Sequence, residues 1–256
     1  MIKLLKFEWR KLWRQKSLYI CFGVGLLIAA LFIILGKVLE NRFGVEFGTA
    51  TGSLLGMLPK SGFMSLLGIY LALFVCSDFS QHTIKNIYAR GYSRTAVYAA
   101  KYLISLGVAL AMALLYLVFS FFFTLILGAP LGSLTGEQWA ALVLQLWILV
   151  GIHALYFGIA MMIGKTGGSV AINVIGISLV FSIIGLLISI LDIDFDIDAY
   201  NIESLFQFVT GLQIDTSAMP VVNLETDLVV RSLVMPIVYV AVFVGGGWFV
   251  NRRREV

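Results

Sequence analysis

The chain has 256 residues, of which 60% are hydrophobic and only 12% are charged. Soluble domains carry about 25% charged residues, so this composition excludes a water-soluble fold and indicates a protein whose solvent is lipid. The formal net charge of +4 comes from basic residues that are split among short segments. That distribution argues against nucleic acid as a partner. The two cysteines lie in or beside apolar runs, so no disulfide framework is expected.

The first segment, residues 1–17, is predicted to form an amphipathic helix that lies in the lipid headgroup layer. Trp9 and Trp13 belong to its apolar arc, and Arg10 and Arg14 belong to the basic arc beside it. Tryptophan next to arginine is typical of the membrane interface, so we expect membrane lipid as a partner of this helix. The alternative is the basic region of a signal peptide. It is disfavoured because no small-residue cleavage site follows the next apolar run.

Six apolar runs follow, each about the ~20 residues that a bilayer core requires. The second is the shortest, the third is long enough to tilt or protrude, and the last contains Pro236, which predicts a kink. The runs cover residues 18–36, 61–77, 102–128, 138–163, 169–191 and 231–250.

The distribution of charge predicts the orientation of the chain. With the N-terminus inside, the inner segments hold 14 of the 18 lysines and arginines, and the outer segments hold 11 of the 14 acids. Lysine and arginine are enriched on the cytoplasmic side of membrane proteins. We therefore expect both termini in the cytosol. Residues 37–60 and the acidic 192–230 segment, whose apolar residues suggest short helices on the outer surface, are then extracellular.

A polar loop at residues 78–101 is the longest interruption on the basic side. The spacing from Thr83 to Ala89 predicts a short helix, which Gly91 can close, and Ser93 can cap the helix that follows. Apolar and aromatic residues of this loop are expected to form an exposed patch with a basic rim, as protein–protein contacts do. The patch is Ile84, Ile87, Tyr88 and Tyr92, and the rim is Lys85, Arg90 and Arg94. The alternative is a solvated loop without a partner.

The cores of the six runs contain no Asp, Glu, Lys or Arg. Ion-driven transporters need an ionisable group at depth, so energy for any transport is expected to come from another chain. The notable polar residues inside the runs are Gln145, His153 and Asn173. For these we favour hydrogen bonds between helices over a proton relay or a substrate contact.

Known catalytic and ligand motifs are not met. Gly164-Lys165-Thr166 resembles the end of a phosphate loop, but position 159 is Ile where that motif needs Gly. Alternating aspartates from Asp192 to Asp198, with Glu203 twelfth, resemble a calcium loop, but Ile197 replaces its glycine. We expect no catalytic, cofactor or metal site in this chain.

The whole arrangement resembles the membrane subunits of ABC-2-type ABC transporters. The likeness rests on the basic segment Phe7-Glu8-Trp9-Arg10-Lys11, the six spans and the inner loop after the second span. In that loop Asp78 matches the family's acid, and Thr83-Ile84-Lys85 and Ser93-Arg94 match its short motifs. The sequence departs from the pattern at His82, where the family has Gly, and at Gly91-Tyr92, where Pro is common.

The resemblance implies an all-α polytopic fold with six transmembrane helices, an interfacial helix at residues 1–17 and a cytosolic coupling helix between Thr83 and Arg94. It implies a separate ATP-binding subunit that carries ATP and Mg²⁺, and a second permease chain, identical or related. The first, second and fifth helices would line the pathway under the 192–230 loop. The expected function is export of an amphipathic or hydrophobic cargo, a peptide, antimicrobial or lipid, across a bacterial cytoplasmic membrane. The alternatives are an ATP-independent immunity or scaffold protein, and a channel.

Overall fold

The computed structural model describes residues 2–44, 49–60, 62–80, 83–191, 195–210 and 224–253, and these residues contain helices and no strand. The helices in chain order are α1 (Ile2–Arg14), α2 (Lys16–Phe43), α3 (Ala50–Lys60), α4 (Phe63–Ser80), α5 (Thr83–Ala89), α6 (Arg94–Ile126), α7 (Gly136–Ile163), α8 (Thr166–Ala171), η1 (Ile172–Gly176), α9 (Ile177–Ile190), η2 (Asp198–Tyr200), α10 (Ile202–Phe208), α11 (Thr226–Tyr239), η3 (Val240–Val244) and α12 (Gly245–Arg253).

The structure confirms the predicted all-α polytopic fold. Six helical segments are long and apolar enough to cross a membrane, and each overlaps one of the six predicted runs. The second, α4, is the shortest at 18 residues, and the third, α6, is the longest at 33 residues. Every span except α4 begins before its predicted run, and α2, α4 and the last span also end beyond theirs, because polar residues at the ends of a run can continue the same backbone hydrogen-bond ladder.

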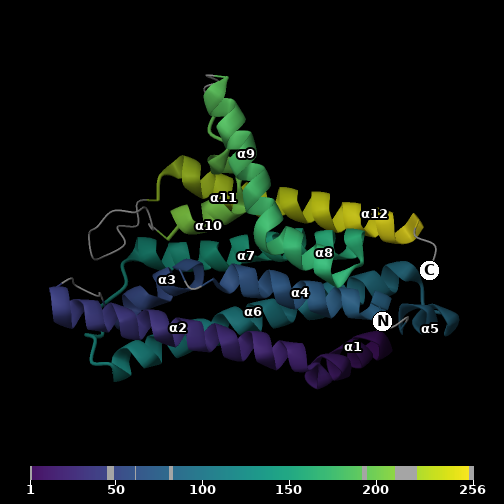
Figure 1. The fold of residues 1–256 in the computed structure, drawn as a ribbon, viewed down its shortest axis with the longest axis horizontal. Coiled ribbons are helices and arrows are strands. Elements are labelled where there is room, and N and C mark those ends of the chain that lie inside the picture. Colours follow the sequence, from purple (N-terminus) through teal and green to yellow (C-terminus); the bar gives the residue numbers. More distant parts are fainter. Residues whose placement is uncertain are drawn as a thin grey trace.

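The bundle has two ends that differ in composition. One end, which we call the basic end, is formed by α1, α5, the start of α6 and the end of α12, and both chain termini lie there (Figure 1). The opposite end, the far end, holds the end of α2 and the start of α7 (Figure 1). An even number of spans returns the chain to its starting side, so this placement fits six crossings.

Helix α7 is the centre of the bundle. Two thirds of its most apolar window, 67%, is buried, against 22% for α2 and 17% for the last span. Helices α4, α10, α11 and α12 all pack against α7. Apolar side chains on α2 and α9 are largely exposed, as expected of surfaces that meet lipid.

The contact between α7 and the last span is close because α7 has glycine where the two backbones meet. A Cβ atom at Gly158 would lie 2.5 Å from the carbonyl oxygen of Phe243, and one at Gly151 would lie 2.8 Å from Cα of Pro236. Pro236 lies inside α11, and the backbone turns to the wider π-helical form at η3 a few residues later. The kink expected at Pro236 stays a prediction, since α11 continues to Tyr239; the irregular turn in this span is η3, next to the close contact with α7.

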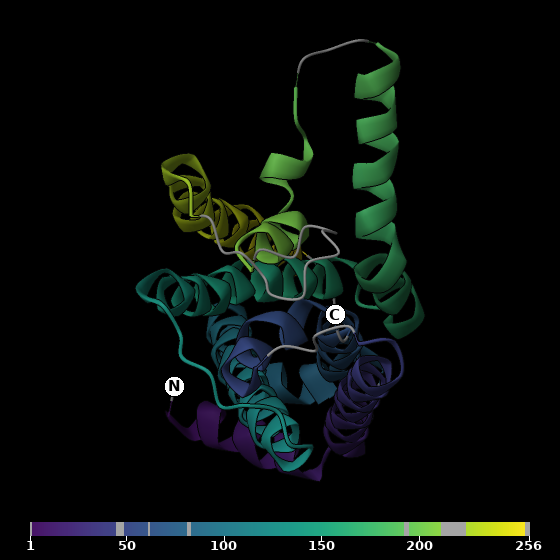
Figure 2. The same ribbon diagram turned by 90° about the vertical axis from the view of Figure 1, so that its left-hand side faces the viewer.

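The fifth span is not straight. After α8 the chain passes through the π-helical turn η1, and α9 then leaves the bundle at a steep angle (Figure 1, Figure 2). Single π-helical turns are a known cause of sharp helix bends. Most side chains of α9 are exposed, whereas Asn173 within η1 is buried.

The short helices expected in the segment after the fifth span are present as η2 and α10, and α10 packs onto the bundle. Ile202 and Phe206 of α10 are fully buried, and the helix packs against α7 (Figure 2). The physical reason is that the apolar residues of α10 are covered by α7 and α11 instead of by lipid headgroups.

The glycine contact gives a matched test. Gly158→Ala should lower the free energy of unfolding by about 1–3 kcal/mol, because the added methyl group overlaps the Phe243 backbone. Gly107→Ala on α6 has open space around it and should be neutral or raise stability by up to about 1 kcal/mol. Thermal unfolding of both variants in one detergent measures the difference. Equal behaviour of the two variants would contradict this packing.

Candidate functional site

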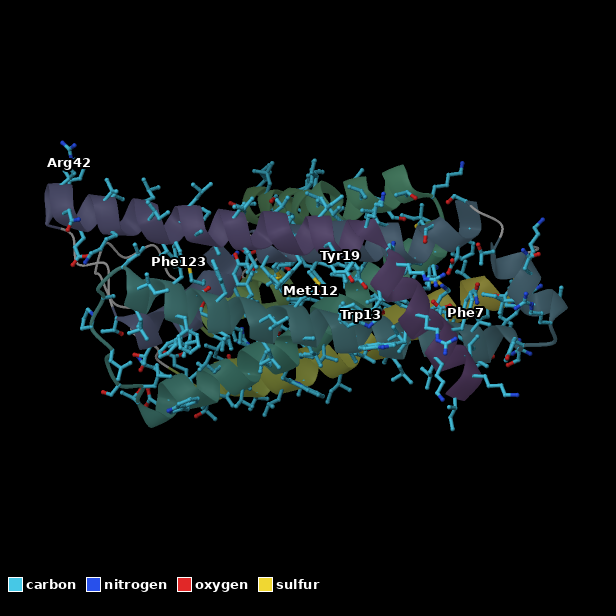
Figure 3. All side chains as sticks on the ribbon, turned by 90° about the horizontal axis from the view of Figure 1, so that it is seen from below. Phe7, Trp13, Tyr19, Arg42, Met112 and Phe123 are labelled. Atoms are coloured by element: carbon cyan, nitrogen blue, oxygen red, sulfur yellow. The ribbon has the colours of Figure 1, made fainter. Side chains whose placement is uncertain are left out.

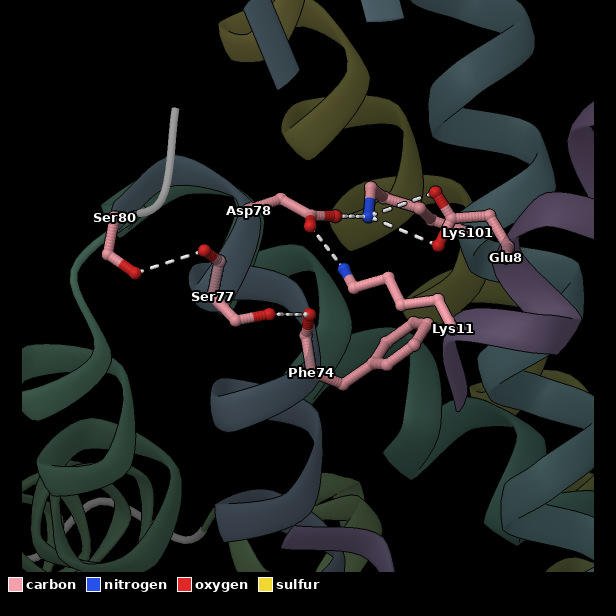
Figure 4. Close-up of polar contacts among 7 residues, drawn as sticks. All are labelled: Glu8, Lys11, Phe74, Ser77, Asp78, Ser80 and Lys101. Atoms are coloured by element: carbon pink, nitrogen blue, oxygen red, sulfur yellow. Dashed lines mark hydrogen bonds and ion pairs between the residues drawn. The ribbon is translucent and has the colours of Figure 1, made fainter. Parts of the chain in front are cut away.

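A buried cluster of four charged side chains joins three helices at the basic end. Lys101 of α6 donates to Asp78 of α4 and lies 3.3 Å from the Glu8 carboxylate of α1. Lys11, also of α1, donates to the second Asp78 oxygen (Figure 4). Lys101 and Glu8 are fully buried. We call these residues the charge cluster.

The charge cluster is neutral as a whole, since it holds two carboxylates and two ammonium groups. Burying an isolated charge costs several kcal/mol, so pairing is what permits these groups to leave water. The ring of Phe74 adds to the environment of both cations, because each lysine nitrogen lies 5.4 Å from the ring centre. Burial lowers the pKa of Lys11, and the negative charge of Glu8 opposes that shift.

The structure corrects the predicted boundaries of the polar loop. Helix α4 continues to Ser80 and α6 begins at Arg94. The segment between the two spans is therefore residues 81–93, shorter than the predicted 78–101. Asp78 and Lys101, expected in a solvated loop, are buried inside helices. The prediction failed because each charge was assumed to need water, whereas both are paired within the bundle.

One sequence signal for this cluster was available. Leu4, Glu8 and Leu12 follow one another at intervals of four, and they are the residues of α1 that are buried. Glu8 is therefore an acid on the inward face of a basic helix, which requires a cation in the facing helices. Charge counting along the chain treats it only as one acid among six basic residues.

The short helix α5 is present at the predicted residues, with the predicted caps. It ends at Ala89, and Gly91 follows with φ of +84°, a conformation that favours glycine. The Ser93 hydroxyl accepts a hydrogen bond of 3.2 Å from the Ala96 N–H and caps α6.

The predicted exposed apolar patch on α5 is wrong in part. Ile87 is 6% exposed and packs with Leu4 of α1 and Val97 of α6, and Tyr88 is half-buried against the same cluster. Tyr92 is half-buried as well, and the side chain of Ile84 lies outside the described part of the structure. These apolar residues hold α5 onto the bundle, because burial there removes them from water.

The outward face of α5 is polar and basic. Lys85, Asn86 and Ala89 are exposed, as is Arg90 in the turn that follows α5, and Thr83 is half-buried. A helix whose apolar side is fixed to the bundle and whose opposite side presents cations offers a rigid, positively charged surface at the basic end.

Arg94 has a different role from the one expected for a rim residue. Its guanidinium donates a hydrogen bond of 3.0 Å to the Arg252 carbonyl in α12 and lies 5.5 Å from the ring centre of Tyr88. Burial raises the pKa of the Tyr88 phenol, and the Arg94 charge opposes the shift. Tyr98, also expected in the loop, is buried, and its hydroxyl donates to the Val244 carbonyl at 2.8 Å. Arg94 and Tyr98 thus tie the start of α6 to the last span.

Helix α1 turns its tryptophans outward. Trp9 and Trp13 are about half exposed, and their rings meet edge to face with centroids 5.8 Å apart. Arg10 and Arg14 are exposed beside them. Arg42 lies at one end of the bundle, whereas Trp13 and Phe7 lie in its other half (Figure 3). An exposed band of tryptophan and arginine on a helix at the end of a membrane bundle has the chemistry of the headgroup layer.

The three polar residues noted inside the spans are buried and hydrogen-bonded across helices. The Gln145 amide donates to the Leu55 carbonyl at 3.4 Å, and His153 Nε2 lies 2.9 Å from the Ser105 hydroxyl. The Asn173 amide donates to the Gly68 carbonyl at 3.2 Å. Each contact joins two helices, as membrane bundles use such residues to fix helix pairs.

The phosphate-loop-like segment that the sequence disfavoured forms the turn between α7 and α8. Gly164 has φ of +67° and closes α7, and Lys165 begins the turn into α8. Asp192 and Asp194 of the calcium-like pattern lie outside the described residues. Among the residues that the structure describes, no group of three or more His, Cys, Asp or Glu side chains is placed to hold a metal ion.

The sequence matches the family described as ABC-2 family transporter protein over residues 4–177. The match covers more than half of the chain, so the chain belongs to this family, as the resemblance predicted. Searches of curated proteins and of solved structures find no match. Family membership makes the chain a multi-pass membrane permease subunit and not itself the ATPase, and it implies an ABC ATP-binding partner in general.

Removing one member of the charge cluster should be costly. Lys101→Met leaves two buried acids with one cation and should lower the free energy of unfolding by about 3–5 kcal/mol. Lys85→Met, an exposed site, should change it by less than about 0.5 kcal/mol. Thermal unfolding in detergent compares them.

A double variant tests whether neutrality is the cause. Asp78→Asn combined with Lys101→Met leaves one acid, Glu8, and one cation, Lys11, so the net charge of the cluster stays zero. The loss of unfolding free energy in the double variant should be smaller than the sum of the losses in the two single variants, by about 0.5–3 kcal/mol. Strict additivity would mean that the residues act independently of each other.

Proposed function

We propose that this chain is the membrane subunit of an ATP-driven exporter and that α5 docks in a separate ATP-binding subunit. The observation that carries the proposal is the construction of α5. Its apolar side is fixed to α1 and α6, its outward side presents Lys85, and Arg90 is exposed in the turn that follows it. Because this short helix is packed on the bundle, a force that a soluble partner applies to it is passed to α1 and α6 instead of detaching the helix.

The charge cluster supplies a route for that force. Helix α5 packs on Leu4 of α1, and α1 is bound through Glu8 and Lys11 to Asp78 of α4 and Lys101 of α6. A displacement of α5 would therefore move α1 and the ends of two spans together, which is a rigid-body form of switching. Arg94 adds the end of α12 to the same unit.

The proposed setting is a bacterial cytoplasmic membrane with both termini in the cytosol. Fourteen of the 18 lysines and arginines then lie on the inner side, and α1 lies along the inner leaflet with Trp9 and Trp13 in the headgroup layer. The proposed assembly pairs two permease chains, identical or related, with two ATP-binding subunits that carry ATP and Mg²⁺.

The proposed cargo is amphipathic or hydrophobic, such as a peptide, an antimicrobial or a lipid. Support comes from the interior of the spans, whose polar residues Gln145, His153 and Asn173 are neutral groups already engaged between helices. A pathway lined mainly by apolar side chains suits a cargo that is itself largely apolar.

Orientation is tested by cysteine labelling. Cys21 and Cys76 are buried, so background reaction with a membrane-impermeant maleimide should be low. Asn86→Cys on α5 should react in inside-out vesicles and be protected in intact cells, and Arg42→Cys at the far end should show the reverse (Figure 3). Labelling of Asn86→Cys from outside intact cells would overturn the proposal.

Docking is tested by charge reversal on the outward face of α5. Lys85→Glu with Arg90→Glu should abolish co-purification of the ATP-binding subunit while membrane insertion stays normal, because both side chains are exposed and carry no packing role. Lys16→Glu with Lys165→Glu makes the same change of charge at exposed sites outside α5 and should retain the subunit. Retention of the subunit by the α5 variant would argue against docking there.

A further inference from the structure

The last span carries two exposed arginines at its end, and each stacks on an aromatic ring of the preceding turn. The guanidinium of Arg252 lies 5.6 Å from the ring centre of Trp248, and that of Arg253 lies 4.1 Å from the ring centre of Phe249. Phe249 is exposed, whereas Trp248 is half-buried and its indole N–H donates to the Thr95 hydroxyl at 3.2 Å. The rings therefore support two cationic groups at the surface of the basic end.

The two guanidinium groups are not paired with any acid of the described chain. Among the ion pairs that the described residues form, none includes Arg252 or Arg253. Arg254 and Glu255, which follow in the sequence, lie outside the described residues. Other cations that lie over aromatic rings are already engaged: Lys11 and Lys101 in the charge cluster, Arg231 with Asp227, and Arg94 with the Arg252 carbonyl.

The stacking also sets the depth of the two charges. Helical side chains lean toward the N-terminus of their helix, and each arginine stacks on the ring four residues before it. Because α12 ends at the basic end of the bundle (Figure 1), this direction leads back toward the spans. The guanidinium groups therefore lie beside aromatic residues at the end of a span, and such residues mark the headgroup level of a bilayer.

We infer that Arg252 and Arg253 bind the phosphodiester group of an anionic phospholipid. A guanidinium presents a planar set of N–H donors that matches phosphate oxygens, and stacking on a ring leaves its edge free to donate. The lipid phosphate is the anion found at this depth, whereas an acidic protein surface would meet the charges from the water side. An anionic lipid is favoured over a zwitterionic one, because the zwitterionic headgroup carries a cation of its own.

The site adjoins the start of α6 and the short helix α5. Arg94 donates to the Arg252 carbonyl at 3.0 Å and lies over the ring of Tyr88 in α5. A lipid bound at the end of α12 would therefore also restrict α5. This consequence for docking rests on the proposed function, but the binding of lipid requires neither an ATP-binding subunit nor transport. The two arginines lie beyond residues 4–177, the part that matches the family.

The test measures which lipid surrounds Trp248 in the full chain. The other four of the five tryptophans are replaced by Phe, and the chain is placed in vesicles of equimolar phosphatidylglycerol and phosphatidylcholine. Bromine on the acyl chains of one lipid or the other quenches nearby tryptophan fluorescence, so the two measurements give the local lipid ratio. Phosphatidylglycerol should be enriched about threefold or more at Trp248.

A matched chain retains only Trp139, which is 58% exposed near the start of α7 at the far end. It should show no enrichment of phosphatidylglycerol, because no stacked arginine lies at this site. This control also shows that the vesicles mix their lipids evenly. Absence of enrichment at Trp248 would overturn the proposal.

Two charge variants separate a site from the general attraction of a basic surface. Arg252→Gln with Arg253→Gln should abolish the enrichment at Trp248, and the bond from Arg94 remains because it uses a backbone carbonyl. Lys16→Gln with Lys165→Gln removes the same charge from exposed positions outside α12 and should keep most of the enrichment. Equal loss in the two pairs would overturn the proposal.

Phe249→Leu tests the stacking without a change of charge. Arg253 loses its support in this variant, so the enrichment should fall by about half. An unchanged enrichment would mean that surface charge alone attracts the lipid, and it would overturn the stacked site. These results are separate from the docking experiment, because the vesicles contain no ATP-binding subunit.

Discussion

The arrangement of the basic end depends on the neutrality of one buried charge cluster. Glu8, Lys11, Asp78 and Lys101 come from three helices, and each is tolerated away from water only because the others are there. Buried ion pairs often add little net stability compared with apolar packing, but loss of one partner is severe. The cluster therefore acts mainly by specifying position: α1 has one register on α4 and α6 that balances all four charges.

This constraint explains the division of roles among the basic residues. The inward-facing Lys11 and Lys101 form ion pairs within the charge cluster. Arg94 is hydrogen-bonded to α12. Only the outward-facing cations, such as Lys85 and Arg90, remain at the surface of α5. The basic end is thus an internally neutral platform with a positive outer face, which is a reasonable construction for contact with a soluble subunit.

The local features of the fold could be predicted from the sequence, and the non-local ones could not. The six spans follow from hydropathy, and the boundaries of α5 follow from Gly91 and Ser93, because these depend on residues close together in the chain. The pairing of Asp78 with Lys101 depends on two helices and on Glu8 far away in the sequence. Counting charges by segment assigns such residues to solvent. The predicted loop was therefore too long, and Ile87 was predicted to be exposed although it is buried.

The same limit applies to Glu203, with a different consequence. Its position after the fifth span suggested a surface helix, and Ile202 and Phe206 pack α10 against α7, with the half-buried Glu203 between α7 and α9. Backbone that leaves and re-enters a bundle needs its polar groups satisfied by protein, and here Asn201 caps α10 through the Glu203 N–H at 3.0 Å. The charge cluster carries its own counter-ions, whereas Glu203 is met only by hydroxyl groups.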